Sequence, residues 1–330
     1  MATPDEPVAH YFPLSSGQYA IKPGFYRLGH DFGNGATDRR LFQLDRQFAD
    51  YRQVKQDARC EQLDKYFCVT PEAADLAPIL NRFLIDRLCS DFPGYFHLFQ
   101  TREEQQLDCG LSGQSLQFTR DGHYLGASPA NPANTPPYCN GLDALALQVQ
   151  EDLALLDLRG EQARLCAIHL CQPNHWDPRE KIGRDFAKIH QPVPDMHRIN
   201  ARAAQLLQAC LQEGPFVRFA WGIATDERLN HHPDPPPGTD RQQWQGRAFD
   251  PVHPAAWLRV ERQVLHGLPQ TSALLFTIRT YHTPLTRLSV NEQQLLYQAI
   301  AGMEPHHREY KGLADPTALL NWLGSLYTSG

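Results

Sequence analysis

Three strand-like segments follow one another in the second half of the chain. Residues 216–224, 257–265 and 273–281 alternate their side chains with the period of two that predicts half-buried β-strands. The short link from Gly267 to Gln270 joins the last two as an antiparallel pair. A chain with these neighbouring strands builds a largely antiparallel sheet, and this constrains its fold more than any other feature.

Helical and strand patterns precede these three strands. Residues 163–170 predict a buried strand, and residues 177–190 and 198–212 predict two helices. The order strand, helix, helix and three antiparallel strands is typical of an α+β fold with helices on one side of the sheet. A small cavity between sheet and helices is then the expected place for a ligand.

The predicted helix over 177–190 has the clearest end signals. Asp177 is a good N-cap, and Pro178 stands at the first helical position, where its missing N–H costs nothing. Apolar side chains recur along one face of this helix: Ile182, Phe186 and Ile189. His190 shares that face in the last turn, before Pro192 stops the helix.

Flanking elements are expected on both sides of this core. A hairpin is predicted over 114–126, around the Asp121-Gly122 pair. Further helices are expected over 72–90, 141–158, 290–303 and 315–327. Two Pro-rich stretches, 128–137 and 231–240, indicate loops. The chain should therefore divide into an N-terminal α+β segment (1–140), a ligand-binding core (141–285) and C-terminal helices (286–330), packed as one unit.

The composition argues against several classes of function. The chain has 31 basic and 37 acidic residues, a net charge of −6, so it offers no basic footprint for nucleic acid. It shows no secretory leader and no run of about 18 apolar residues that would span a membrane. The eight cysteines lack any Cys-x-x-Cys pair, which argues against a zinc or iron–sulfur site built on them. We expect a cytoplasmic protein.

His190 is the first candidate for chemistry. Position alone favours a core histidine bonded to a backbone carbonyl, although a fixed imidazole in a dry pocket can also bind a metal. Three other histidines lie close enough in sequence to compete for such a role: His169, His175 and His197.

Charged residues gather on two of the predicted strands. Glu261 lies on the polar face of its strand, whereas Arg262 falls on the apolar side, where an unpaired charge is costly. Arg279 and Tyr281 share a face of the next strand. Position alone leaves a solvated face and a ligand site both open for these residues. For two more residues, Arg259 and Gln263, position alone predicts a side chain exposed to solvent.

Aromatic and paired histidine residues carry weaker signals. Trp221 could line a cofactor pocket, but a packed core is the more frequent role of a buried tryptophan. The pairs His231-His232 and His306-His307 stand in polar or Pro-flanked surroundings and indicate surface loops.

Several segments together go beyond general pattern. They are Pro173-x-x-Trp176, the run Ile189–Pro194, Arg198-Ile199-Asn200, LRVERQVLHGLP followed by LLFTIRTYHTPL, and Tyr310–Leu313. In this order they resemble the alpha subunits of haem-dependent oxidative N-demethylases, also described as dimethylamine monooxygenases. The resemblance covers most of residues 165–315 and is weaker before residue 130.

The resemblance implies a fold and an activity. It implies a PAS-like core that holds haem b through a histidine, and removal of a methyl group from small secondary amines with dioxygen. Dimethylamine would give methylamine and formaldehyde. Electrons would come from a separate reductase subunit that carries FMN and a [2Fe–2S] cluster and is supplied by NAD(P)H.

The resemblance also implies site residues. His190 matches the family's His-x-Pro-Val-Pro segment and is the expected iron ligand, with Trp221, Asn200 and Arg198 as further haem contacts. Four strand residues are the candidates for the distal pocket or the propionates: Glu261, Arg262, Arg279 and Tyr281.

Two other functions stay open. A PAS-like haem protein could sense a gas or redox state without turnover, although the chain shows no appended signalling domain. A haem-free scaffold with charged surface strands is the third possibility.

Overall fold

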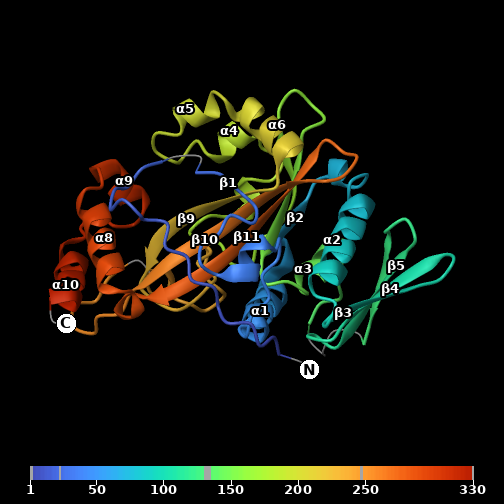
Figure 1. Cartoon of the computed structure of the whole chain (residues 1–330), viewed down its shortest axis with the longest axis horizontal. Helices are drawn as coiled ribbons and strands as arrows, with labels where there is room; N and C mark the ends of the chain where they lie inside the picture. The colour runs from blue at the N-terminus through green and yellow to red at the C-terminus, as the bar shows by residue number, and fades with distance from the viewer. Residues whose placement is uncertain (1–2, 22–23, 130–134, 246–247, 329–330) are drawn as a thin grey trace.

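A computed structural model describes residues 3–21, 24–129, 135–245 and 248–328 (Figure 1). Within these residues the chain forms a large antiparallel sheet in the strand order β1-β9-β10-β11-β7-β8-β2. The strands are β1 (Tyr26–Arg27), β2 (Phe67–Val69), β7 (Asp152–Asp157), β8 (Arg164–His169), β9 (Phe216–Ala224), β10 (Trp257–Gly267) and β11 (Ala273–Pro284). Helices and antiparallel sheets in one chain confirm the predicted α+β class.

The three predicted strands form the centre of this sheet. β10 pairs with β9 on one side and with β11 on the other, both antiparallel. In this register Glu261 lies between Ala220 of β9 and Thr280 of β11. The predicted antiparallel pair around Gly267 is confirmed, and so is the strand predicted over 163–170, as β8.

The predicted helix over 177–190 is wrong as one continuous helix. Asp177 caps only the 3-10 turn η3 (Pro178–Glu180), and Gly183 then adopts a left-handed conformation with φ +74° that ends the helical path. Asp185 caps a new short helix, α4 (Phe186–Ile189), whose C-cap is His190. The apolar stripe nevertheless packs together beneath this segment.

Two other predicted helices are also interrupted. Only the start of 141–158 is helical, as α3 (Gly141–Ala146), because the apolar run that follows pairs on both sides as the buried strand β7. The helix predicted over 198–212 divides into α5 (His197–Asn200) and α6 (Ala203–Glu213).

The rest of the chain surrounds the main sheet (Figure 1). Helix α1 (Phe48–Tyr66), which is kinked at Gln62, is not predicted by the sequence pattern, whereas the helix predicted over 72–90 is confirmed as α2 (Ala77–Asp91). A second antiparallel sheet contains β3 (Phe96–Gln100), β4 (Glu104–Cys109), β5 (Gln114–Thr119) and β6 (Tyr124–Ser128), the last two forming the predicted hairpin. The C-terminal part contains η4 (Leu285–Arg287), α8 (Val290–Ala301), α9 (Pro305–Tyr310) and α10 (Thr317–Thr328). The short elements η1 (Gly35–Arg39), η2 (Pro71–Ala73) and α7 (Arg241–Gln245) complete the described chain.

Helices pack against both faces of the central strands rather than one. On one face α6 contacts β10 and β11 and buries Leu265 and Ile278. On the other face Val260 and Tyr281 pack with apolar side chains of α8 and α10. The two faces of the central strands therefore have different packing partners, α6 on one face and α8 with α10 on the other.

The two Pro-rich stretches have different outcomes. Residues 130–134 of the first lie outside the described residues. The second lies in the connection between β9 and β10, as expected for a loop, but its first two residues, His231 and His232, are buried rather than on the surface. Among the described helices, each is too short or too polar to cross a membrane.

Candidate functional site

Successive residues of a strand point to opposite faces, so β9, β10 and β11 present two distinct surfaces. The Glu261 face, as we name it, carries these side chains: Arg218, Ala220, Gly222, Arg259, Glu261, Gln263, Thr280 and His282. The Arg279 face carries Trp221, Arg262, Arg279 and Tyr281. The predicted catalytic residues therefore do not gather, because Glu261 lies on one face and the other three on the opposite one.

His190 lies over the Glu261 face, at the end of α4. Its Nδ1 donates a hydrogen bond to the carbonyl of Phe186 at 2.8 Å, and the two rings lie 4.1 Å apart. Because a carbonyl can only accept, Nδ1 carries the proton and Nε2 keeps its lone pair. Burial lowers the pKa of His190 to about 4, and Arg218 adds to this effect. The ring is therefore a fixed, neutral imidazole at neutral pH, the form that ligates iron.

Arg218 places a positive charge near this histidine, and the negative charge of Glu261 lies near Arg218. Burial lowers the pKa of Arg218, while the negative charge of Glu261 raises it. Arg218 makes no hydrogen bond with the residues that the structure describes, and its Nε is buried. Gln263 donates to Glu261 Oε2 at 3.1 Å, and Arg259 Nε lies 3.5 Å from Oε1. The guanidinium of Arg218 is thus available to an anionic group of a ligand.

Small side chains form the middle of the Glu261 face. Ala220 is only half-buried although β10 pairs beside it. A Cβ built on Gly222 would meet only the Nδ2 of Asn174, at 3.9 Å. A flat group can therefore approach the backbone of β9 here more closely than it could over larger residues.

Histidines border the far end of the same face. His231 stacks on His175 at 5.1 Å between ring centroids and contacts Asp226 at 2.9 Å. Burial lowers the pKa of His282 well below its ordinary value, and Arg259 contributes. Arg259 itself is buried and donates to the carbonyls of Gln172 and Leu229, so the predicted solvent exposure of Arg259 is wrong.

The Arg279 face is filled by the N-terminal part of the chain. Arg279 donates to Asp45 at 2.8 Å, and its guanidinium lies 3.7 Å above the ring of Tyr51. Arg262 donates to the carbonyls of Arg40 and Leu41 at 2.8 and 3.3 Å. These contacts hold residues 40–51 against the sheet.

Two further predicted site residues, Tyr281 and Trp221, also lie on the Arg279 face. Tyr281 donates from its hydroxyl to Gln43 Oε1. Trp221 is buried against Val260 and Tyr281 and contacts the ring of Tyr19 edge-on. Both side chains lie across the sheet from His190.

The remaining predicted haem contacts lie on α5. Asn200 Nδ2 donates to the carbonyl of Ala187 at 3.4 Å and so joins α5 to α4, while its Oδ1 is buried without a hydrogen bond to the described residues. Arg198 is exposed. Asn200 is thus close to the His190 segment, and Arg198 is directed to solvent.

The competing histidines have other partners. His169 is fully buried, with Nε2 3.2 Å from Asp143 and Nδ1 3.7 Å from Cys171. His175 stacks on His231, and His197 is exposed on α5. His190 is half-buried, and its Nδ1 is held by the carbonyl of Phe186, which leaves the Nε2 lone pair for a ligand.

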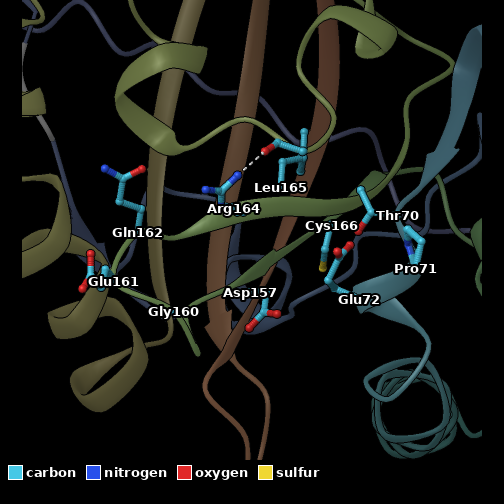
Figure 2. A pocket seen from close by; sticks show the side chains of 11 residues that line it. Thr70, Pro71, Glu72, Asp157, Gly160, Glu161, Gln162, Arg164, Leu165 and Cys166 are labelled. Carbon is cyan, nitrogen blue, oxygen red and sulfur yellow. Dashed lines mark hydrogen bonds between the residues drawn. The ribbon is translucent and has the colours of Figure 1, made fainter.

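A large cavity of about 780 Å³ lies elsewhere, between η2 and the start of β8. Figure 2 shows three carboxylates around it, those of Glu72, Asp157 and Glu161. Hydrogen bonds from Arg159 lower the pKa of Asp157, so this carboxylate is charged. Carboxylates repel the two propionates of a haem, and none of the predicted site residues lines this cavity.

Sequence reasoning missed Arg218 and the burial of Arg259. Arg218 interrupts the alternation of 216–224 as a single charge on the small-residue face, and this was the signal that could have found it. For Arg259 the sequence holds no signal, because its partners are carbonyls contributed by distant loops.

Together the fold and this site define an α+β protein that presents the neutral imidazole of His190 beside a face of small side chains. On that face Arg218 makes no hydrogen bond with the described residues. The chain matches, over residues 34–318, the model of the family described as haem-dependent oxidative N-demethylase, alpha subunit-like. It belongs to that family.

Proposed function

We propose that this chain is the haem b component of a monooxygenase that demethylates small secondary amines. Dimethylamine, dioxygen, two electrons and two protons would give methylamine, formaldehyde and water. The observation that carries the proposal is His190, whose Nδ1 hydrogen bond to Phe186 leaves Nε2 as a ligand, within a chain of a haem-dependent family.

The Glu261 face fits a haem by three features. His190 would supply the axial ligand, Arg218 would pair with a propionate, and the small residues of β9 would face the ring. When bound, haem b supplies the redox chemistry that activates dioxygen. We also propose that β9–β11 with α4–α6 correspond to the PAS-like core that the family resemblance implies.

We assign Glu261 to the amine. Its carboxylate is oriented by Gln263 and is largely buried, with a side chain 12% exposed. A buried carboxylate attracts a dialkylammonium and can accept its proton, which exposes the nitrogen lone pair. Arg218 and Arg259 place positive charge near this carboxylate.

Electrons would arrive from a separate protein. The family is named for an alpha subunit, which supports a multi-subunit enzyme. We propose that the partner is a reductase with FMN and a [2Fe–2S] cluster supplied by NAD(P)H. The structure shows no disulfide bond among the cysteines that it describes, and reduced thiols are typical of the cytoplasmic location that we propose.

The test is a spectrum followed by product analysis. The chain reconstituted with haem should show a Soret band that shifts when dimethylamine, but not ammonium chloride, is added. With a surrogate reductant it should release equimolar formaldehyde and methylamine. A bound haem without formaldehyde from any small secondary amine would instead identify a gas or redox sensor. Absence of a Soret band would leave the haem-free scaffold.

A further inference from the structure

Three potential metal ligands meet at a second place, away from the Glu261 face. Asp195 lies in the segment that connects α4 to α5, and His306 and His307 lie on α9. Asp195 Oδ2 is 3.2 Å from His306 Nε2 and 3.1 Å from His307 Nε2. The centroids of the two imidazole rings lie 4.1 Å apart, and the three ligand atoms all lie within 4.8 Å of one another.

The spacing suits one shared ion. Ligand atoms about 2.0–2.1 Å from a tetrahedral zinc ion lie about 3.3 Å from one another. The observed separations of 3.1 and 3.2 Å are close to this value. Two imidazoles and a carboxylate form a ligand set that first-row divalent metals prefer, with a position left for water.

His307 gives independent evidence. It is buried, with 8% of its surface exposed, yet its Nε2 makes no hydrogen bond to the described residues, although Asp195 is close. A buried polar atom without a hydrogen bond costs free energy unless another partner satisfies it. A metal ion between the three side chains would be that partner.

We infer that Asp195, His306 and His307 form a binding site for a divalent transition metal of the zinc class. The ion would join the segment that follows His190 to the C-terminal helix α9, and so fix the position of that segment. The site is separate from the proposed haem site and does not depend on it.

Cobalt binding to the untagged, haem-free chain tests this inference. Co²⁺ should bind 1:1 with the visible bands of nitrogen and oxygen ligation, and Zn²⁺ should displace it. His306→Ala and Asp195→Asn should each weaken binding at least about tenfold. Asparagine tolerates the left-handed backbone of Asp195 (φ 58°), so the second variant removes the charge without straining the turn.

Two variants serve as controls. His253 contacts Asp250 at 3.1 Å in an exposed pair without a second histidine, so His253→Ala should bind cobalt as the unmodified chain does. His190→Ala should also leave cobalt binding unchanged, which separates this site from the haem site. The inference would be overturned if the His306 and Asp195 variants bound cobalt as tightly as the unmodified chain does. Charge-transfer bands of thiolate ligation would also overturn it.

Discussion

The two faces of the central strands both carry arginines, but these arginines differ in their burial and in their hydrogen bonds. On the Arg279 face, Arg262 and Arg279 donate to partners in the N-terminal segment and are fully buried. On the Glu261 face, Arg218 is half-buried and makes no hydrogen bond with the described residues. Charge on a strand therefore does not by itself indicate a ligand site. The site is where the protein leaves a charge for a ligand to satisfy.

The largest expected effect is on folding. Arg279→Met should lower the free energy of unfolding by about 3–5 kcal/mol, because it leaves Asp45 buried without its partner. Arg218→Met should cost less than about 1 kcal/mol, since Arg218 makes no hydrogen bond to the described residues. Urea unfolding of both variants measures this, and equal losses would remove the distinction between the faces.

The next effect is on turnover. Glu261→Gln should keep haem but lose about 10- to 100-fold in kcat/KM for dimethylamine, because a charged hydrogen bond to the amine contributes about 1.5–3 kcal/mol. Gln263→Ala removes only the residue that orients Glu261 and should lose less. Normal turnover of dimethylamine by Glu261→Gln would contradict the proposed role of the Glu261 carboxylate.

A smaller effect is expected from filling the Glu261 face. Gly222→Leu should weaken haem binding about tenfold, because overfilling a packed contact costs about 1–3 kcal/mol. Gly222→Ala is the matched control, since its Cβ would make only an ordinary contact. Haem titrations compare the two, and full haem affinity in the leucine variant would show that the cofactor lies elsewhere.

The smallest effect is on pH dependence. Burial lowers the pKa of His282 and of His231, so the unfolded chain binds protons first as the pH falls. Stability from these residues should be complete above about pH 6.5 and fall below it, by up to about 1.4 kcal/mol per pH unit for each histidine. His282→Gln should flatten this slope, and His253→Gln should not. An unchanged slope in the first variant would contradict the burial of a neutral ring.

The central strands could be predicted from the sequence because their alternation is local. The helix over 177–190 could not, because nothing in its apolar stripe shows that Gly183 takes a left-handed conformation. The sequence pattern does not predict helix α1 because its buried face includes the charged residues Lys55, Arg59 and Lys65. These charges interrupt the apolar periodicity that would indicate a helix. Lys55 donates to main-chain carbonyls of the distant residues Ala146 and Val149, a pairing that only the folded chain shows.

The candidate site was predictable only in part. His190 followed from its helix face and from the family resemblance, and Glu261 from its strand. The sequence pattern already places Glu261 and Arg262 on opposite faces of one strand, so these two side chains cannot line a single pocket. The role of the Arg279 face depends on residues 40–51, far away in the sequence, so strand patterns alone could not assign it.

Haem binding by a His190→Ala variant tests the central claim most directly. The variant should lose at least about 90% of its haem or show a shifted Soret band, because it lacks the axial nitrogen. His197→Ala, which changes an exposed neighbour on α5, should bind haem as the unmodified chain does. Full haem content with an unshifted Soret band in His190→Ala would contradict the assignment of the iron ligand and, with it, the choice of the Glu261 face.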